Sequence, residues 1–155
     1  MPRRTSPSII VGWREWVALP ELGLPAVKAK VDTGAKTSSL HAFDLETFRE
    51  DGRERVRFSV HPLQENERLV VRAEADVVDE RAVTSSSGHE ELRVVIRTPL
   101  RLGDLTWPVE LTLTDRRVMR LRMLLGREAL QGRLLVDVAS SFLHGYRHRP
   151  QRLYR

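Results

Sequence analysis

Asp32 has the clearest potential for chemistry in this chain, because it ends a strand-like run in the segment AKVDTGAK at 29–36. Gly34 permits the backbone angles and close contacts of a sharp turn, and the Thr33 hydroxyl can hydrogen-bond neighbouring backbone and stiffen it. Two such turns face to face would share one proton between two carboxylates, since like charges in contact cannot both ionise easily. One carboxylate then activates water while the other polarises a carbonyl group. An ordinary hairpin turn is the alternative.

No other segment offers a comparable set of groups. The segment GAKTS at 34–38 lacks the arrangement of a phosphate-binding loop, in which a lysine directly follows the second glycine. The segment SSSGHE at 85–90 places hydroxyls beside His89, but it has no elbow sequence for a serine nucleophile. We therefore expect neither a bound nucleotide nor any other cofactor.

Zinc is the remaining chemical alternative. The chain has five histidines, no cysteine and no H-E-x-x-H motif. His144 and His148 have the spacing of one helix face, but Gly145 lies between them and makes a stable helix doubtful. We expect no metal site, and a zinc-dependent peptidase stays open because scattered His, Asp and Glu ligands can also form one.

The elements that must position Asp32 are mostly strands. Val27, Ala29 and Val31 alternate with lysines, which is the period of a strand with one buried face. One short helix is expected over 122–132, with Gly132 just after its end. Further strand-like or hairpin segments lie at 9–19, 42–62, 68–79, 82–97, 100–114 and 133–143. Many short strands with one helix predict an all-β protein, either a small barrel or a sandwich.

The net charge of +5 comes from the two ends of the chain. Residues 1–8 and 145–155 hold six arginines and no acid, so residues 9–144 carry a net charge of −1. We expect one domain over 9–144 between a disordered basic N-terminal tail and a solvated basic C-terminal tail. Binding of RNA or another polyanion by the arginines is the alternative. The tryptophans do not interleave with basic residues, so we do not expect nucleic-acid binding.

The compartment is predicted from what the chain lacks. No run approaches the ~18 apolar residues of a membrane span. The start, MPRRTSPSII, has no apolar leader segment, and without cysteine there can be no disulfide. We expect a cytoplasmic protein with no membrane partner.

The segment MLLGREAL at 123–130 is a second motif, in which apolar residues precede Gly, Arg and a short helical stretch. The turn at Asp32, the strand–turn–strand at 82–97 and this segment follow one another in an order that resembles the retropepsins, in which a flap hairpin covers the cleft. More closely, the chain is similar to the bacterial retropepsin-like aspartic peptidases often labelled ATP-dependent zinc proteases. Members of that family occur alongside ligases that add glutamate to protein tails. The similar stretches cover most of residues 9–143, although we find no motif for ATP or zinc.

This resemblance implies a small closed β-barrel of the retropepsin (acid protease) type, with one short helix near the C-terminal end. It implies a catalytic set of Asp32, Thr33 and Gly34. It also implies a substrate-binding set of Ala35, Lys36, Thr37, Ser86, Ser87, Gly88, His89, Arg116 and Arg127. Only one Asp-Thr-Gly is present, so a carboxylate pair requires a homodimer with two-fold symmetry.

Lys36 departs from the viral retropepsins, which carry an acid at this position that pairs with the arginine of the Gly-Arg segment. Lys36 and Arg127 would then both be cationic near the cleft, which favours acidic peptides such as glutamate tails. A Lys36 ammonium close to Asp32 would also make the carboxylate pair less able to hold a shared proton. In the alternative, Lys36 points into solvent and Arg127 pairs with Glu128 or another acid. The competing hypothesis for the whole chain is a catalytically silent barrel that binds acidic tails or RNA.

Overall fold

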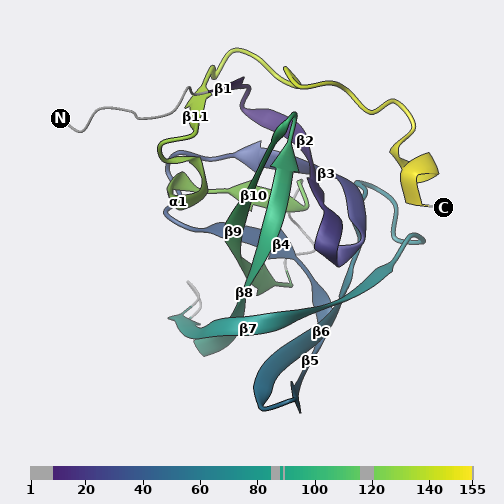
Figure 1. Ribbon diagram of the computed structural model, residues 1–155, viewed down its shortest axis with the longest axis vertical. Helices are drawn as coiled ribbons and strands as arrows, with labels where there is room; N and C mark the ends of the chain where they lie inside the picture. Colours follow the sequence, from purple (N-terminus) through teal and green to yellow (C-terminus); the bar gives the residue numbers. More distant parts are fainter. Residues whose placement is uncertain (1–8, 85–87, 89, 116–120, 155) are drawn as a thin grey trace.

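The computed structural model describes residues 9–84, 88, 90–115 and 121–154, mostly as strands (Figure 1). The strands are β1 (Ile9–Val11), β2 (Arg14–Leu19), β3 (Leu24–Val31), β4 (Ser38–His41), β5 (Phe43–Glu50), β6 (Arg53–Val60), β7 (Val71–Thr84), β8 (Glu90–Leu102), β9 (Leu105–Thr114), β10 (Met123–Leu125) and β11 (Leu134–Val136). The helices are the 3₁₀-helices η1 (Pro20–Leu22) and η2 (Pro150–Tyr154) and the α-helix α1 (Arg127–Leu130). The basic tail predicted at 1–8 lies outside the described residues.

Six strands of the described chain close into a barrel in the order β2-β3-β10-β4-β9-β8, because β8 also pairs with β2 through Ala18 and Arg101. Strands β7, β6 and β5 continue the sheet from β8, and β1 pairs in parallel with β11 in a separate two-stranded sheet (Figure 1). The prediction of an all-β closed barrel with a short helix near its C-terminal end is confirmed. None of the helices in the described part of the chain has the length and apolar character of a membrane span.

Alternating side chains build the core of the barrel. In β3, Val27, Ala29 and Val31 are buried while Lys30 is exposed, as the period-2 pattern predicts. Strand β9 is buried over Leu111–Thr114 on both faces. The largest fully buried side chains come from many strands and include Leu19, Leu24, Leu40, Phe58, Ile96, Leu100, Leu111 and Met123. Strand β3, which ends just before Asp32, thus packs on a continuous apolar core.

The helix predicted over 122–132 is wrong in its extent. Met123–Leu125 form strand β10, which pairs in parallel with β3 and antiparallel with β4, and only Arg127–Leu130 are α-helical. A short apolar run suits a buried strand as well as a helix. The segment forms a strand here because the backbone N–H and C=O groups of β3 and β4 hydrogen-bond to it. The strand predicted at 133–143 is likewise confined to β11.

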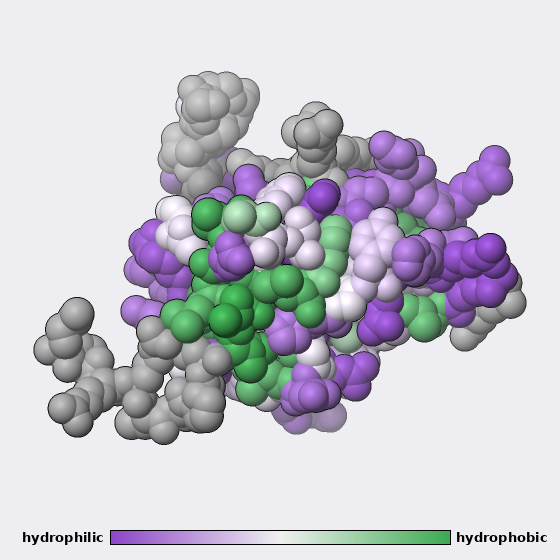
Figure 2. Space-filling view, turned by 90° about the horizontal axis from the view of Figure 1, so that it is seen from above, coloured by the Kyte–Doolittle hydropathy of each residue, from purple (hydrophilic) through white to green (hydrophobic). Residues whose placement is uncertain are grey.

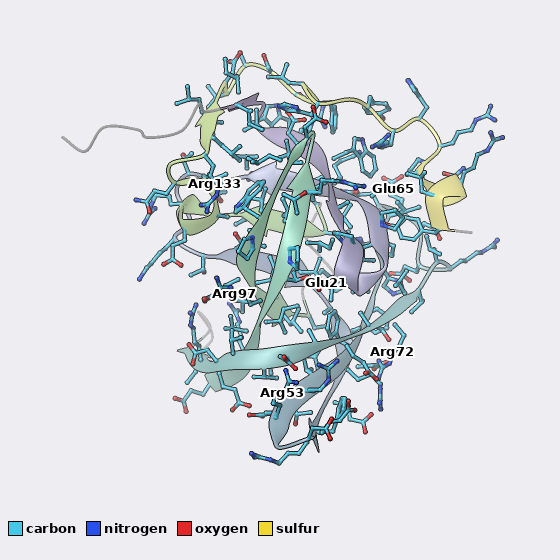
Figure 3. All side chains as sticks on the ribbon, viewed as in Figure 1. Glu21, Arg53, Glu65, Arg72, Arg97 and Arg133 are labelled. Carbon is cyan, nitrogen blue, oxygen red and sulfur yellow. The ribbon has the colours of Figure 1, made fainter. Side chains whose placement is uncertain are left out.

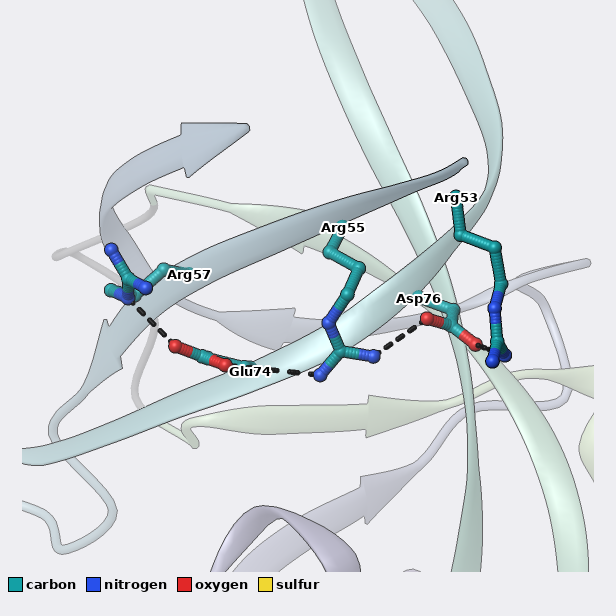
Figure 4. Close-up of polar contacts among 5 residues, drawn as sticks. All are labelled: Arg53, Arg55, Arg57, Glu74 and Asp76. Atoms are coloured by element: carbon teal, nitrogen blue, oxygen red, sulfur yellow. Dashed lines mark hydrogen bonds and ion pairs between the residues drawn. The ribbon is translucent and has the colours of Figure 1, made fainter. Parts of the chain in front are cut away.

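Charged side chains pair across β6 and β7, the strands that lead to the β7–β8 hairpin. Arg55 Nη1 donates to Asp76 Oδ1 at 2.6 Å, and Arg57 Nε donates to Glu74 Oε1 at 2.8 Å (Figure 4). Arg53 contacts the second oxygen of Asp76 at 3.3 Å. Cross-strand pairs of opposite charge contribute roughly 0.2–1 kcal/mol each. This row of pairs stabilises the first half of β7, which pairs with β6. The second half of the same strand pairs with β8.

Tyr154 attaches the last described residues to the barrel. Its hydroxyl donates a hydrogen bond to the backbone carbonyl of Ala26 in β3, and η2 packs beside that strand. Burial raises the pKa of Tyr154 to about 12. The segment 150–154 therefore lies against β3.

Glu15 holds the preceding part of the C-terminal segment. Its carboxylate is fully buried and accepts hydrogen bonds from three backbone N–H groups, those of Gly12 at 2.7 Å, Leu143 at 2.9 Å and His144 at 3.2 Å. Hydrogen bonds to a charged acceptor are stronger than neutral ones. One buried side chain of β2 thus connects the start of the barrel with the segment that follows β11.

Replacing Glu15 by Gln should destabilise the fold. The amide keeps only one oxygen, so at least one buried N–H loses its acceptor, and the free energy of unfolding should fall by about 1–3 kcal/mol. Urea unfolding measures this change. Glu21→Gln is the control, because Glu21 is exposed in η1 (Figure 3), and it should shift stability by no more than about 0.5 kcal/mol. Equal stability of the two variants would contradict the anchoring role of Glu15.

Candidate active site

The turn after β3 holds Asp32 by its backbone and by its side chain. The Asp32 N–H donates to the Leu125 carbonyl at 2.8 Å, and the Asp32 carbonyl accepts from the Ala35 N–H at 3.2 Å. The side-chain Oδ1 accepts from the Gly34 N–H at 2.9 Å. Asp32 is half-buried, so its carboxylate has a fixed direction and remains accessible.

Gly34 allows close contact with the Asp32 carboxylate because it has no side chain, and its backbone angles are not unusual. A Cβ atom at this position would lie 3.2 Å from Asp32 Oδ1, which is tighter than ordinary packing. The glycines with positive φ in the described chain are elsewhere, and Gly34 is not among them. Of the two properties expected of this glycine, only its lack of a side chain is used in the turn.

Strand β10 and the residues after it pack directly against the loop that follows Asp32. The Gly126 N–H donates to Ser38 Oγ at 3.0 Å, and the Arg127 N–H donates to the Ala35 carbonyl at 2.8 Å. A Cβ atom on residue 126 would lie 2.4 Å from the Thr37 carbonyl oxygen and 2.9 Å from that of Ala35. Only glycine can occupy this position without moving the backbone.

Lys36 is exposed, as in the alternative hypothesis, but the Arg127 guanidinium binds backbone carbonyl groups and not Glu128. The Arg127 guanidinium donates to the carbonyl oxygens of Thr33 and Gly34, both at 3.1 Å. Lys36 Nζ lies 3.9 Å from Glu128 Oε1 on the surface. Arg127 therefore stabilises the Asp-Thr-Gly turn through its backbone carbonyl groups. Glu128 interacts with Lys36 and not with Arg127. Within the described residues Lys36 forms no ion pair with Asp32.

Three of the remaining residues of the predicted binding set are described by the structure. Ala35 and Thr37 belong to the loop after Asp32, and Thr37 lines a polar pocket beside α1. Gly88 lies beyond the arms of the β7–β8 hairpin, which pair as far as Thr84 and Glu90, and it has a φ of 85°. Four predicted residues lie outside the described part of the chain, namely Ser86, Ser87, His89 and Arg116.

An apolar surface that was not predicted from the sequence lies next to the turn. Ile10, Leu135 and Val138 are exposed, Val138 to 77%. They come from β1, from β11 and from the residues just after β11, on the face where Figure 2 shows apolar side chains gathered. A hollow of about 450 Å³ on this face is lined by Leu135 and also by Thr33 and Arg127. The signal in the sequence was the run LLVDV at 134–138, which reads equally well as a buried strand.

His41 lies beneath the residues that flank the segment 116–120. It is fully buried in β4, its N–H donates to the Arg122 carbonyl at 2.8 Å, and its Nδ1 lies 4.0 Å from the Asp115 carboxylate. Burial, followed by the nearby Arg122 guanidinium, lowers the pKa of His41. The imidazole is therefore held in its neutral form at neutral pH.

The histidine pair considered for zinc does not share a helix face. His144 and His148 lie in a non-helical stretch, where His144 Nε2 contacts the Ile10 carbonyl at 2.9 Å and His148 packs against the ring of Tyr146. Throughout the residues that the structure describes, no group of three or more His, Asp or Glu side chains is arranged to hold a metal ion.

Replacing Gly126 by Ala should loosen the site. The added methyl group overlaps backbone atoms of the Thr37 loop, and overpacking of this kind lowers the free energy of unfolding by about 1–3 kcal/mol. Chemical denaturation measures the change. Gly132→Ala is the control in the same segment, because its methyl group meets nothing within 4 Å and only its φ of 75° causes strain. A smaller loss for Gly126→Ala than for Gly132→Ala would contradict the tight fit of β10 beside the loop.

Comparisons with known proteins agree with this architecture. Residues 10–147 match the family model described as RimB-like, retropepsin-like aspartic endopeptidase RimB. A solved structure from Legionella pneumophila subsp. pneumophila str. Philadelphia 1, a protein of unknown function (DUF785), is similar with a TM-score of 0.75 and 27% identity. The similarity covers 89% of this chain and 99% of that one.

Curated relatives are similar over most of this chain. A protein of Desulfotalea psychrophila named probable alpha-L-glutamate ligase is 55% identical over 130 residues, which is 84% of this chain and 28% of the relative. A protein of the same name from Parasynechococcus marenigrum is 55% identical over 133 residues, 86% of this chain and 28% of the relative. The chain thus spans less than a third of the length of these relatives. The resemblance to bacterial retropepsin-like proteins with a glutamate-ligase association is confirmed, and the chain belongs to the RimB-like family of retropepsin-like aspartic endopeptidases.

Proposed function

We propose that this chain is an aspartic peptidase in which Asp32 and the Asp32 of a second copy form the water-activating pair. The observation that carries the proposal is the half-buried Asp32 carboxylate, oriented by the Gly34 N–H at the end of a barrel strand. The turn is held from three sides, by Leu125, by the loop after Asp32 and by the Arg127 guanidinium. Such a fixed group can act as a general base without having to be reoriented.

In the proposed reaction the two carboxyl groups share one proton. The ionised member removes a proton from a water molecule, whose oxygen attacks the scissile carbonyl carbon while the protonated member donates to the carbonyl oxygen. The resulting tetrahedral intermediate collapses with cleavage of the C–N bond. The leaving nitrogen takes a proton from one carboxyl group while a hydroxyl of the intermediate returns a proton to the other carboxylate. A free acid and a free amine are released, and the pair again holds one proton.

The apolar surface beside the turn supports the second copy. Exposed apolar patches on proteins mark interaction sites. Leu135 lines the hollow that contains Thr33, Ile10 is its partner across β1 and β11, and the exposed Val138 follows β11. A two-fold axis near this face would bring two copies of the Asp-Thr-Gly turn together, because the same patch meets itself across the axis. A single Asp-Thr-Gly in the sequence requires such an arrangement if two carboxylates are needed.

Acidic peptides, including glutamate tails, are the proposed substrates. The support is the name of the curated relatives, probable alpha-L-glutamate ligase, on longer proteins that contain a region similar to this chain. The same names favour a second candidate function, a domain that holds glutamate tails without cutting them. The two candidates differ in whether the Asp32 carboxylate is needed for chemistry or only for the shape of the turn.

Replacing Asp32 by Asn tests the chemistry. Hydrolysis of an oligoglutamate peptide should fall by at least about 10²–10⁴-fold, because the base that activates water is removed, while binding of the peptide persists. Release of free amines and fluorescence anisotropy of labelled peptide measure the two properties. Asp104→Asn, exposed in the β8–β9 hairpin, should leave hydrolysis unchanged. If the natural sequence binds the peptide but cuts neither it nor casein between pH 4 and pH 8, the non-cutting domain is favoured.

Replacing Val138 by Glu tests the second copy. The side chain is exposed, so the barrel should stay folded, but a charge on the apolar face should shift dimers to monomers and remove hydrolysis in parallel. Sedimentation velocity and peptide hydrolysis across a dilution series measure both effects. Val78→Glu is the control, because Val78 is exposed on β7, and it should alter neither the dimerisation nor the hydrolysis. A variant that is fully monomeric and fully active would refute the shared site.

A further inference from the structure

A small polar pocket lies between the loop that follows Asp32 and the outer faces of β8 and β9. Its volume is about 190 Å³. It is lined among others by Thr37, Arg81, Arg97, Glu110, Thr112 and Glu128. Strands β7, β8 and β9 therefore form one wall, and the beginning of β4 and α1 form the other. Figure 3 shows Arg97 on the side of the barrel that carries α1.

Most charges of this pocket are already matched by neighbours. Arg81 Nε donates to Asp79 Oδ2 at 3.0 Å, and its Nη2 lies 3.6 Å from Glu110 Oε1. Glu128 is accompanied by Lys36. Each carboxylate of the pocket thus has a cation within ion-pair distance.

Arg97 differs from the other charged groups of the pocket. It is exposed, and it lies directly across from Glu110 in the register of β8 and β9. No ion pair of Arg97 within 4.0 Å is found among the described residues. Since Glu110 is the partner of Arg81, the guanidinium of Arg97 is the cation of this pocket that a ligand can engage. Guanidinium groups bind carboxylates through two parallel hydrogen bonds.

The pocket shares its backbone with the candidate active site. Ser38 is a lining residue, and its Oγ accepts the hydrogen bond from Gly126. The Glu128 N–H donates to the Lys36 carbonyl at 3.1 Å. A group bound in the pocket therefore rests on the same loop that begins at Asp32. Ser38 follows Asp32 by six positions in the chain, so the two lie at most about 22 Å apart, and an extended peptide bound across Asp32 spans that distance with about seven residues.

We propose that this pocket is a subsite for one carboxylate side chain of the bound peptide, with Arg97 as the residue that determines specificity. The inference rests on the proposed function, because it assumes a peptide bound at Asp32. The guanidinium of Arg97 binds the carboxylate, and the Thr37 side chain lies at the pocket wall beside it. Glu110 and Glu128 limit the pocket to a single negative charge by repulsion. A neutral amide of the same shape forfeits the charge-assisted hydrogen bonds.

Peptide binding in the Asp32→Asn background tests the subsite without turnover. The probes are fluorescein-labelled hexapeptides in which each glutamate in turn is replaced by glutamine. Arg97→Gln should weaken binding of the all-glutamate peptide by about 10- to 100-fold, and should leave unchanged the peptide whose glutamine occupies the subsite. Arg97→Lys should recover part of the loss, since it restores the charge but not the paired donors.

Arg101→Gln is the matched control. Arg101 is exposed on the same strand four residues away, and so on the same face of β8. It should leave the affinity for every peptide unchanged. Equal weakening by the two variants, equal weakening of glutamate and glutamine peptides by Arg97→Gln, or no measurable binding of the all-glutamate peptide by the parent would each overturn the subsite.

The two proposals fail in different ways. Selective loss of glutamate binding in Arg97→Gln, together with no hydrolysis by the natural sequence, leaves the subsite standing and removes the peptidase. Hydrolysis by the natural sequence that does not change in Arg97→Gln for glutamate or glutamine peptides leaves the peptidase standing and removes the subsite.

Discussion

The insertion of β10 between β3 and β4 is the constraint on which the site depends. The same short segment accepts the hydrogen bond of the Asp32 N–H through Leu125, donates from Gly126 to Ser38 and donates from Arg127 to the Ala35 carbonyl. A turn of a few residues is flexible when only its own atoms hold it. Here it is bonded to the end of β10 and to the two residues that follow, about 90 residues away in the chain. The orientation of the carboxylate is therefore a property of the whole barrel.

This packing also decides how the charges near the turn are used. Arg127 faces the carbonyl oxygens of Thr33 and Gly34, where a guanidinium stabilises the partial negative charge of the backbone. Lys36 and Glu128 form a surface pair, which contributes little energy in water. Farther along the wall, the exposed Arg97 of β8 lines the neighbouring polar pocket.

The turn lies between two surfaces of opposite character. On one side there is an apolar face (Figure 2), and a hollow lined by residues of β11 and by Thr33 lies there. On the other side the pocket between α1 and β8 is polar and charged. An apolar face suits a second protein surface, whose burial releases water, whereas a polar pocket suits a charged side chain that must exchange water for new hydrogen bonds. The turn thus lies between a face that can bury apolar groups and a pocket that can hold a polar group.

Local patterns in the sequence determined the strands, the turn and the residue of interest. The alternation of Val27, Ala29 and Val31 predicted β3, and Asp-Thr-Gly predicted the turn, since these features depend on neighbours within a few residues. The order of the motifs led to the correct family. Tertiary structure decided the rest. It made 123–125 a strand and not a helix, placed Lys36 and not Arg127 next to Glu128, and brought Arg97 and Thr37 to the lining of one pocket. The reason is physical, because a buried backbone group or an unpaired charge takes whichever partner the fold brings near, and sequence spacing does not contain that distance.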